Sequence, residues 1–349
     1  MGAFRQGADL MEPPGNKRRA TSYDVARLAG VSQSAVSRCF KPGASVSKKM
    51  RKKVMEAAEA LNYQPNAIAR GLITRRSNLV AVLVSSQMNF YYPEVLFQLT
   101  DRLSELGLRV LLFTIRDEAD VETSLDQVWQ YQVDGVISAS YLSVDQHRVL
   151  TDRGIPVIMF NRYFADVPTT SVWCDTAPAV SEMIRHLRDF GHQRFGLLEG
   201  PAHSMVGADR MRNVRRAIAE QGGTITASVR GDYRYASASE ATQDIMGVDV
   251  RPTAIIAAND MMAMGAMDEL KAVFGKSVPG NMSVVGFDGI NSARFASYEL
   301  STIRQPIGRM ADAAISMLID RVEKPELSPE RRVLDGSFLQ GTSTGPARV

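Results

Sequence analysis

The chain has 349 residues, of which 45% are hydrophobic and 23% charged, and its formal net charge is +3. This length allows two or three compact units, and the composition excludes fibrous and disordered classes. The most apolar runs, such as residues 79–84, have the length of a strand, so no membrane span is expected. The N-terminus lacks an apolar signal-peptide core, and Cys39 and Cys174 have no metal-type spacing. We therefore expect a cytoplasmic protein without a metal or cofactor.

The positive charge is concentrated near the N-terminus. Between Lys17 and Arg76 there are 14 Lys or Arg residues and three acidic residues, a local charge of +11, which leaves −8 for the rest of the chain. A small basic unit on an acidic body is the electrostatic footprint of a protein that binds a polyanion. A solvated basic surface without function is the alternative.

The first 64 residues divide into a tail and a three-helix unit. Residues 1–20 have no periodicity and contain a Pro-Pro-Gly break, which predicts a disordered tail. In 21–64, Ser22 is the expected N-cap of a first helix that buries Val25, Leu28 and Ala29. Gly30 is expected to end this helix in a left-handed conformation, and Ser32 to cap the next. Two helices joined by a short glycine turn predict a helix-turn-helix domain, whose second helix enters the DNA major groove.

A third expected helix, 48–61, has one apolar and one basic face. Val54, Ala58 and Leu61 are expected to be buried, whereas the basic residues face solvent as candidate phosphate contacts. These basic residues are Lys48, Lys49, Arg51, Lys52 and Lys53. A basic linker, 65–77, follows with proline at its start. If the unit does not bind DNA, it is a packing cap with an ordinary linker.

From residue 78 onward, strand-length apolar runs alternate with helix-length amphipathic segments. The runs lie at 79–84, 110–115, 135–139, 156–160, 195–198, 254–257 and 283–287. This alternation predicts an α/β body, 78–349, in which helices flank two parallel sheets. A ligand of such a body binds beyond the carboxyl ends of the strands.

Motifs of catalysis are missing from the sequence. The four histidines have no metal-ligand spacing, and there is neither a glycine-rich phosphate loop nor a nucleophile elbow. We therefore expect no enzyme. A solute-binding protein of a sugar transport system is the alternative function, because the body alone would suit it. The basic N-terminal unit favours DNA binding instead.

Two N-terminal stretches, "TSYDVARLAGVSQSAVSRCF" and "VSKKMRKKVMEAAEALNYQPNAIARGL", closely resemble the DNA-binding head and hinge of the LacI/GalR family of transcriptional regulators. The resemblance continues through "FGHQRFGLLEGP", "SVVGFD" and "LSTIRQP". It implies a homodimeric repressor on a palindromic operator, with an all-α helix-turn-helix head and a body like a periplasmic binding protein. Two lobes would close over a small sugar-like effector. The expected first lobe is 78–175 with 306–330, and the second is 176–305 with 331–349.

By this resemblance, the residues that bind DNA can be named. Bases are read by Gln33, Ser34 and Arg38, and the chemistry agrees, because Arg38 can form a bidentate pair with guanine and Gln33 with adenine. Phosphates are held by Tyr23, Ser32, Ser37 and Asn66. In the hinge, Ala69 faces its dimer mate and Leu72 enters the minor groove, where an apolar wedge bends the duplex.

The resemblance also implies the effector site. Carboxylate, amide and guanidinium groups beside aromatic rings suit a polyhydroxylated ligand. A structural alternative exists for several of them; Asn259, for example, can cap the helix that follows it. Because Arg162 and Arg210 are both positively charged, an anionic sugar is an alternative effector. The implied residues are Phe90, Tyr91, Asn161, Arg162, Arg210, Tyr233, Asn259, Asp288 and Gln305.

Overall fold

The computed structural model describes residues 20–41, 43–64, 76–85, 90–115, 118–202 and 204–348. The expected tail up to residue 19 and the expected hinge residues Asn66, Ala69 and Leu72 lie outside the described residues. Contacts divide the chain into two units, Met1–Ser77 and Asn78–Val349. We refer to the described parts of these units as the head and the body.

The head consists of three helices, α1 (Ser22–Ala29), α2 (Gln33–Cys39) and α3 (Lys48–Ala60). The N-cap of α1 is Thr21 and not the expected Ser22. Thr21 accepts a hydrogen bond from the Asp24 N–H, while the Asp24 carboxylate accepts one from the Thr21 N–H. This reciprocal pair satisfies two backbone donors and fixes where the helix begins.

The turn between α1 and α2 agrees with the sequence prediction. Gly30 has φ +67°, a left-handed conformation, and the Ser32 hydroxyl caps α2 by accepting from the Ala35 N–H at 3.2 Å. Leu28 was expected to be buried but is 57% exposed, because the inner face of α1 is formed by Val25 and Ala26. The buried core of the head is Val25, Ala26, Val36, Cys39, Val54, Ala57 and Ala58.

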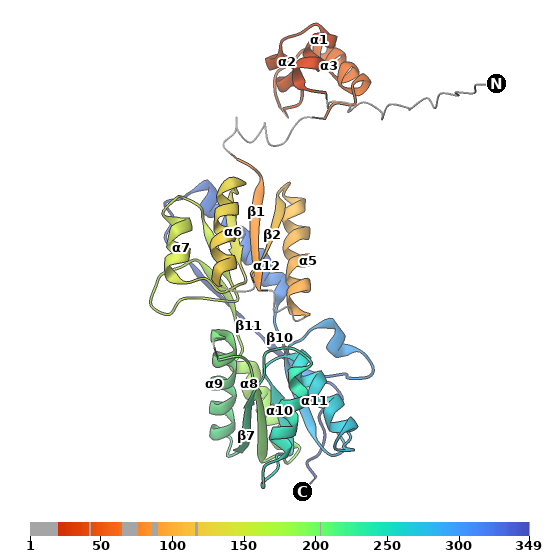
Figure 1. Cartoon of the computed structure of the whole chain (residues 1–349), viewed down its shortest axis with the longest axis vertical. Coiled ribbons are helices and arrows are strands. Elements are labelled where there is room, and N and C mark those ends of the chain that lie inside the picture. The colour runs from red at the N-terminus through yellow and green to blue at the C-terminus, as the bar shows by residue number, and fades with distance from the viewer. Residues whose placement is uncertain are drawn as a thin grey trace, which may run out of the picture. The chain divides into compact units, whose positions relative to one another are not determined.

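The body contains two six-stranded sheets that form two lobes (Figure 1). In the first sheet the order is β11-β5-β4-β3-β1-β2, and every pairing is parallel. Its strands are β1 (Leu79–Ser85), β2 (Arg109–Ile115), β3 (Gly135–Ser138), β4 (Val157–Phe160), β5 (Ser171–Asp175) and β11 (Arg331–Asp335). Its helices are α5 (Tyr91–Glu105), α6 (Glu118–Gln130), α7 (Val144–Thr151) and α12 (Ile307–Glu323).

Burial explains why β1 is apolar along its length. Alternate residues of a strand point to opposite faces. Val80, Val82 and Val84 belong to the core that contains α5 and α12, whereas Ala81 and Leu83 belong to the core that contains α6 and α7. A strand covered on both faces has no solvent-facing position for a polar residue.

The second sheet has the order β12-β10-β9-β8-β6-β7, parallel except for the antiparallel pair β10–β12. Its strands are β6 (Arg194–Glu199), β7 (Thr224–Arg230), β8 (Ala254–Ala257), β9 (Ser283–Asp288), β10 (Ser301–Arg304) and β12 (Ser337–Leu339). Its helices are α8 (Ala177–Asp189), α9 (Met205–Glu220), α10 (Ser237–Met246) and α11 (Asp260–Ala272), with a short 3-10 turn at Asn291–Arg294.

The chain passes between the sheets after β5, after β10 and after β11. The structure differs here from the expected division, in which all of 331–349 lay in the second lobe. Strand β11 pairs with β5 in the first sheet, from Arg331 beside Ser171 to Asp335 beside Asp175. The chain enters the second sheet only at β12. None of the described helices is both long and apolar enough to cross a membrane.

Candidate functional site

The outer face of α2 carries the expected base-reading side chains. Ser34 and Arg38 are exposed, while Ala35, Val36 and Cys39 on the opposite face are buried. Gln33 is half-buried, and its amide Nε2 donates to the Ser22 hydroxyl of α1 at 3.3 Å. This bond directs the Gln33 side chain along the junction of the two helices. The outer face of α2 is therefore polar, and its described residues include no large apolar side chain.

Three expected phosphate contacts of the head border this face. Tyr23 is 68% exposed on α1, and Ser37 is exposed on α2. The Ser32 oxygen accepts from the Ala35 N–H and lies 3.0 Å from the Ser34 hydroxyl. Ser32 thus caps α2 and still carries an O–H that can be donated.

One basic residue of α3, Arg51, makes a structural hydrogen bond within the head. Arg51 donates from Nη1 to the Cys39 carbonyl at 2.8 Å and so satisfies an acceptor at the C-terminus of α2. Lys48 and Lys49, in the first turn of α3, are exposed, and that turn contains no acidic residue. Cations are unfavourable at the positive end of a helix dipole, and a bound anion there offsets this cost. The first turn of α3 is therefore suited to a phosphate.

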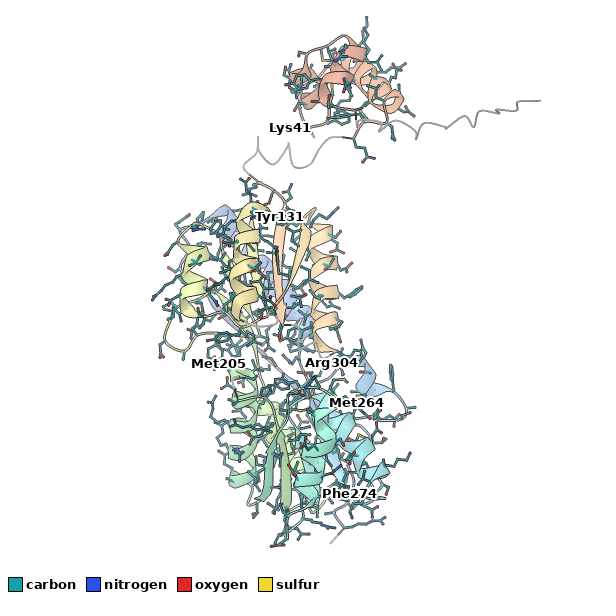
Figure 2. The ribbon with its side chains drawn as sticks, in the orientation of Figure 1. Lys41, Tyr131, Met205, Met264, Phe274 and Arg304 are labelled. Atoms are coloured by element: carbon teal, nitrogen blue, oxygen red, sulfur yellow. The ribbon has the colours of Figure 1, made fainter. Side chains whose placement is uncertain are left out.

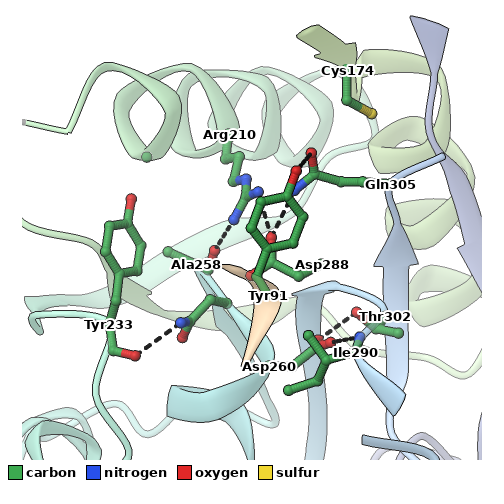
Figure 3. A network of polar contacts seen from close by, with 12 residues as sticks. Tyr91, Cys174, Arg210, Tyr233, Ala258, Asp260, Asp288, Ile290, Thr302 and Gln305 are labelled. Carbon is green, nitrogen blue, oxygen red and sulfur yellow. Dashed lines mark hydrogen bonds and ion pairs between the residues drawn. The ribbon is translucent and has the colours of Figure 1, made fainter. Parts of the chain in front are cut away.

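In the body, side chains converge where strands of both sheets end (Figure 3). The Arg210 guanidinium of α9 donates to Asp288 Oδ1 at 2.6 Å and to the Ala258 carbonyl at 2.7 Å. Gln305 donates to the same Asp288 oxygen at 2.8 Å, and the Tyr91 hydroxyl donates to Gln305 Oε1 at 3.1 Å. All four side chains are buried. This network brings together four residues that the resemblance implied.

Burial and charge set the protonation of this network. Burial alone would lower the pKa of Arg210, but the Asp288 carboxylate raises it above its ordinary value, so the guanidinium stays charged. Burial raises the pKa of Asp288, and the Arg210 guanidinium opposes this effect. Burial, together with the Asp288 charge, raises the pKa of Tyr91 well above its ordinary value. Tyr91 is accordingly a neutral hydrogen-bond donor.

Three expected effector residues have left-handed backbone conformations. The φ angles are 54° at Asn161, 68° at Tyr233 and 110° at Asp288. Asp288 is the last residue of β9, and Asn161 directly follows β4. Such conformations cost free energy in residues other than glycine and concentrate at ligand sites. All three residues lie at or just after the carboxyl ends of strands, where an α/β body binds its ligand.

Asn259 and Tyr233 are tied to each other. The fully buried Asn259 caps α11 by accepting from the Met262 N–H at 3.0 Å, and its Nδ2 donates to the Tyr233 carbonyl at 2.9 Å. The Tyr233 hydroxyl lies 2.7 Å from the Ser204 hydroxyl at the start of α9. The capping alternative for Asn259 is thus present in the structure, and its amide also fixes the backbone of Tyr233.

A pocket of about 310 Å³ lies between the lobes beside this network. Of the expected residues, Asn161, Arg210 and Gln305 line it. Phe90, Tyr91, Arg162, Tyr233, Asn259 and Asp288 do not. Phe90 is 57% exposed at the start of α5, and the Arg162 Nε donates to the Ala139 carbonyl at 3.2 Å.

Figure 2 shows Met205, at the start of α9, and Arg304, at the end of β10, near the junction of the lobes.

Much of the pocket lining was not expected from the sequence. The missed side chains come from the loop after β4, the end of β5 and the second turn of α9; among them are Tyr163, Trp173, Asp175, Asp209 and Arg212. The two groups, 163–175 of the first lobe and 209–212 of the second, meet only because the lobes face each other. Trp173 was the one with a local signal, since it is one of two tryptophans and stands in a strand next to a crossover. No cluster of metal-ligating side chains occurs in the described part of the chain.

Comparison with known proteins finds family matches to the head and to part of the body. Residues 21–66 match the family described as bacterial regulatory proteins, lacI family, and residues 184–344 match the periplasmic binding protein-like domain. Catabolite control protein A of Priestia megaterium is 30% identical over 92% of this chain and 96% of its own length. The HTH-type transcriptional repressor PurR of Photobacterium profundum is 30% identical over 90% of this chain and 95% of its own length.

Solved structures extend the similarity to nearly the whole chain. A lac repressor dimer bound to operator and the anti-inducer ONPF has a TM-score of 0.86 and 26% identity, and the match covers 94% of this chain and all of that one. The complex of the transcriptional regulator CelR with cellobiose has a TM-score of 0.71 and 27% identity, covering 93% of this chain and all of that one.

Proposed function

Because this chain belongs to the lacI family of bacterial regulatory proteins, we propose that it is a transcriptional repressor whose operator affinity is set by an effector bound between the lobes of the body. The observation that carries the proposal is the face of α2, where Gln33, Ser34 and Arg38 stand outside a buried apolar side. A helix with this face fits the major groove. The +11 charge carried by residues 17–76 supplies the attraction to phosphates.

Within the head, we assign roles from the family resemblance and from the chemistry of the side chains. Arg38 pairs with a guanine, and Gln33 and Ser34 contact neighbouring bases. Tyr23, Ser32 and Ser37 hold phosphates, joined by Lys48 and Lys49 at the start of α3. Asn66, Ala69 and Leu72, outside the described residues, keep their expected roles at the phosphates and in the minor groove.

For the effector, we propose a neutral sugar or sugar derivative. The cations at the pocket already have partners, because Arg210 pairs with Asp288 and Arg212 with Asp209. Arg162, which would have favoured an anionic ligand, donates to a backbone carbonyl and does not line the pocket. The pocket also contains the Asp175 carboxylate. A neutral ligand with many hydroxyl groups can form hydrogen bonds with both the donors and the acceptors of the pocket. It adds no charge that would be buried without a partner.

We also propose a homodimer that binds a palindromic operator in the cytoplasm. Two heads are needed to contact two half-sites, and we propose that the body adds a contact between protomers to the one expected at Ala69. Phe97 on α5 is 67% exposed, and Leu112 on the edge strand β2 is 51% exposed. We propose that these two apolar side chains take part in the contact between protomers. Sedimentation of the full chain at micromolar concentration tests this directly.

The proposed function is tested by binding of the full chain to genomic DNA fragments. We expect a few fragments to be retained at physiological salt over random duplex, and a neutral sugar that binds the body to change their retention. Calorimetry with matched neutral and acidic sugars tests the effector class. Heat from an acidic sugar alone would contradict the neutral assignment.

A further inference from the structure

Tyr163 and Asp209 meet across the boundary between the two lobes. Tyr163 lies in the loop after β4 of the first lobe, and Asp209 lies on α9 of the second. The Tyr163 hydroxyl donates to Asp209 Oδ2 at 2.8 Å. Both side chains line the pocket. A direct hydrogen bond therefore joins the lobes at the pocket itself.

Each partner is also held within its own lobe. The Tyr163 ring lies against the Trp173 indole of β5, with 4.7 Å between the ring centroids and 31° between the planes. The other oxygen of Asp209 pairs with Arg212, three residues further along α9. Side chains that are already positioned lose little conformational freedom when they meet, and a hydrogen bond to a carboxylate is stronger than one between neutral groups.

We propose that Tyr163 and Asp209 form a latch that holds the lobes of the ligand-free body together over the pocket. The inference rests on the proposed function, because that function gives the space between the lobes its effector. Three crossover segments, after β5, β10 and β11, connect the lobes covalently. Connections of this kind allow closure by small backbone rotations, so side-chain contacts decide how closed the body is.

The latch exists only when the lobes are together. Its free energy therefore stabilises only the closed arrangement. A net hydrogen bond to a charged group shifts the equilibrium between the open and closed arrangements by roughly tenfold. The effector binds the closed arrangement. Loss of the latch reduces the fraction of closed molecules, and the apparent affinity for the effector falls by the same factor. Tyr163 and Asp209 are thus positioning residues for the effector site.

The chain contains a natural reporter for this motion. Its two tryptophans are Trp173, stacked on Tyr163, and Trp129 on α6, which lies 4.2 Å from the Arg153 guanidinium. In a Trp129→Phe background, and with excitation selective for tryptophan, the emission comes from Trp173. Quenching by acrylamide then reports how open the pocket is, with no DNA or effector present.

The experiment compares Tyr163→Phe, Asp209→Ala and the double variant in that background. Tyr163→Phe keeps the ring on Trp173 and removes only the hydroxyl. We expect either single variant to raise the quenching constant and the radius of gyration from solution scattering, and the double variant to add nothing further. Tyr131→Phe is the matched control, since Tyr131 is exposed at the end of the first lobe away from the junction (Figure 2).

Two results would overturn the latch: quenching of Tyr163→Phe equal to that of the Tyr131→Phe control, or independent, additive effects of the two single variants. Asp209→Ala removes the same hydrogen bond by a change in the other lobe. If one single variant folds poorly, the other still tests the latch. A purely structural role would lower the unfolding midpoint without changing the quenching of the folded protein. Failure of the unaltered chain to bind DNA would refute the proposed function and leave this result standing.

Discussion

Replacement of Arg210 by methionine tests how the buried network is held together. Arg210 is 5% exposed, and its guanidinium supplies one of the two described side-chain donors to Asp288. Removal of one partner of a buried ion pair leaves the other charge uncompensated and costs about 3–5 kcal/mol. The Ala258 carbonyl also loses its donor, which adds about 1 kcal/mol or more. Urea unfolding of the body at neutral pH should show this loss.

The loss should depend on pH in a defined direction. Burial raises the pKa of Asp288, and without Arg210 nothing comparable opposes it. The folded variant then holds a proton at pH values where the unfolded chain, with an ordinary pKa of about 3.9, has released it. The deficit relative to the unaltered protein is therefore full above the raised pKa and shrinks as the pH falls toward the ordinary value.

A double variant, Arg210→Met with Asp288→Asn, separates the charge from the orphaned carbonyl. It should recover most of the loss at neutral pH and show little dependence on pH. Additive losses in the double variant, or a deficit equally large at pH 5 and pH 8, would refute the reasoning that an unpaired buried carboxylate is responsible.

Three further predictions concern the head. Arg38→Lys should remove about 1–3 kcal/mol of discrimination between operator and random duplex, because lysine cannot form the bidentate pair with guanine; gel shifts in which both affinities fall equally would contradict this role. Lys48→Gln should weaken binding to all sequences alike and reduce the slope of log affinity against log salt by about 1, and an unchanged slope would remove Lys48 from the phosphate contacts. Thr21→Ala should cost the head about 1 kcal/mol of stability in thermal unfolding, whereas Ser22→Ala, the matched control, should cost less because Ser22 does not cap the helix and loses only the long hydrogen bond from Gln33.

The sequence predicted the parts of the fold that follow from local chemistry. Gly30 and Ser32 were placed correctly, because a left-handed turn and a helix cap each require particular residues. The cap of α1 was misplaced by one residue, because Ser22 and Thr21 are both good caps and the side chain of Asp24 decides between them. The buried strand β1 was equally clear from its uninterrupted apolar run.

Features that depend on distant segments were not predictable in this way. Strand β11 alternates exposed and half-buried residues and has no apolar run, so neither its existence nor its place in the first sheet was visible. The pocket residues Tyr163 and Asp209 meet across lobes that local patterns do not position. Arg210, Asp288 and Gln305 were each expected at the effector site from a family resemblance, but the hydrogen bonds among them were not expected, because no spacing rule in the sequence brings these three residues together.

Selection from a pool of random duplexes measures sequence recognition by α2 most directly. The full chain is incubated with the pool at physiological salt, and the retained sequences are compared with those retained by a variant in which Gln33, Ser34 and Arg38 are all alanine. We expect a two-fold symmetric motif for the unaltered chain, and for the variant retention without sequence preference. An unaltered chain that enriches no motif, or a variant that enriches the same motif, would contradict the assignment of α2 as the helix that reads DNA.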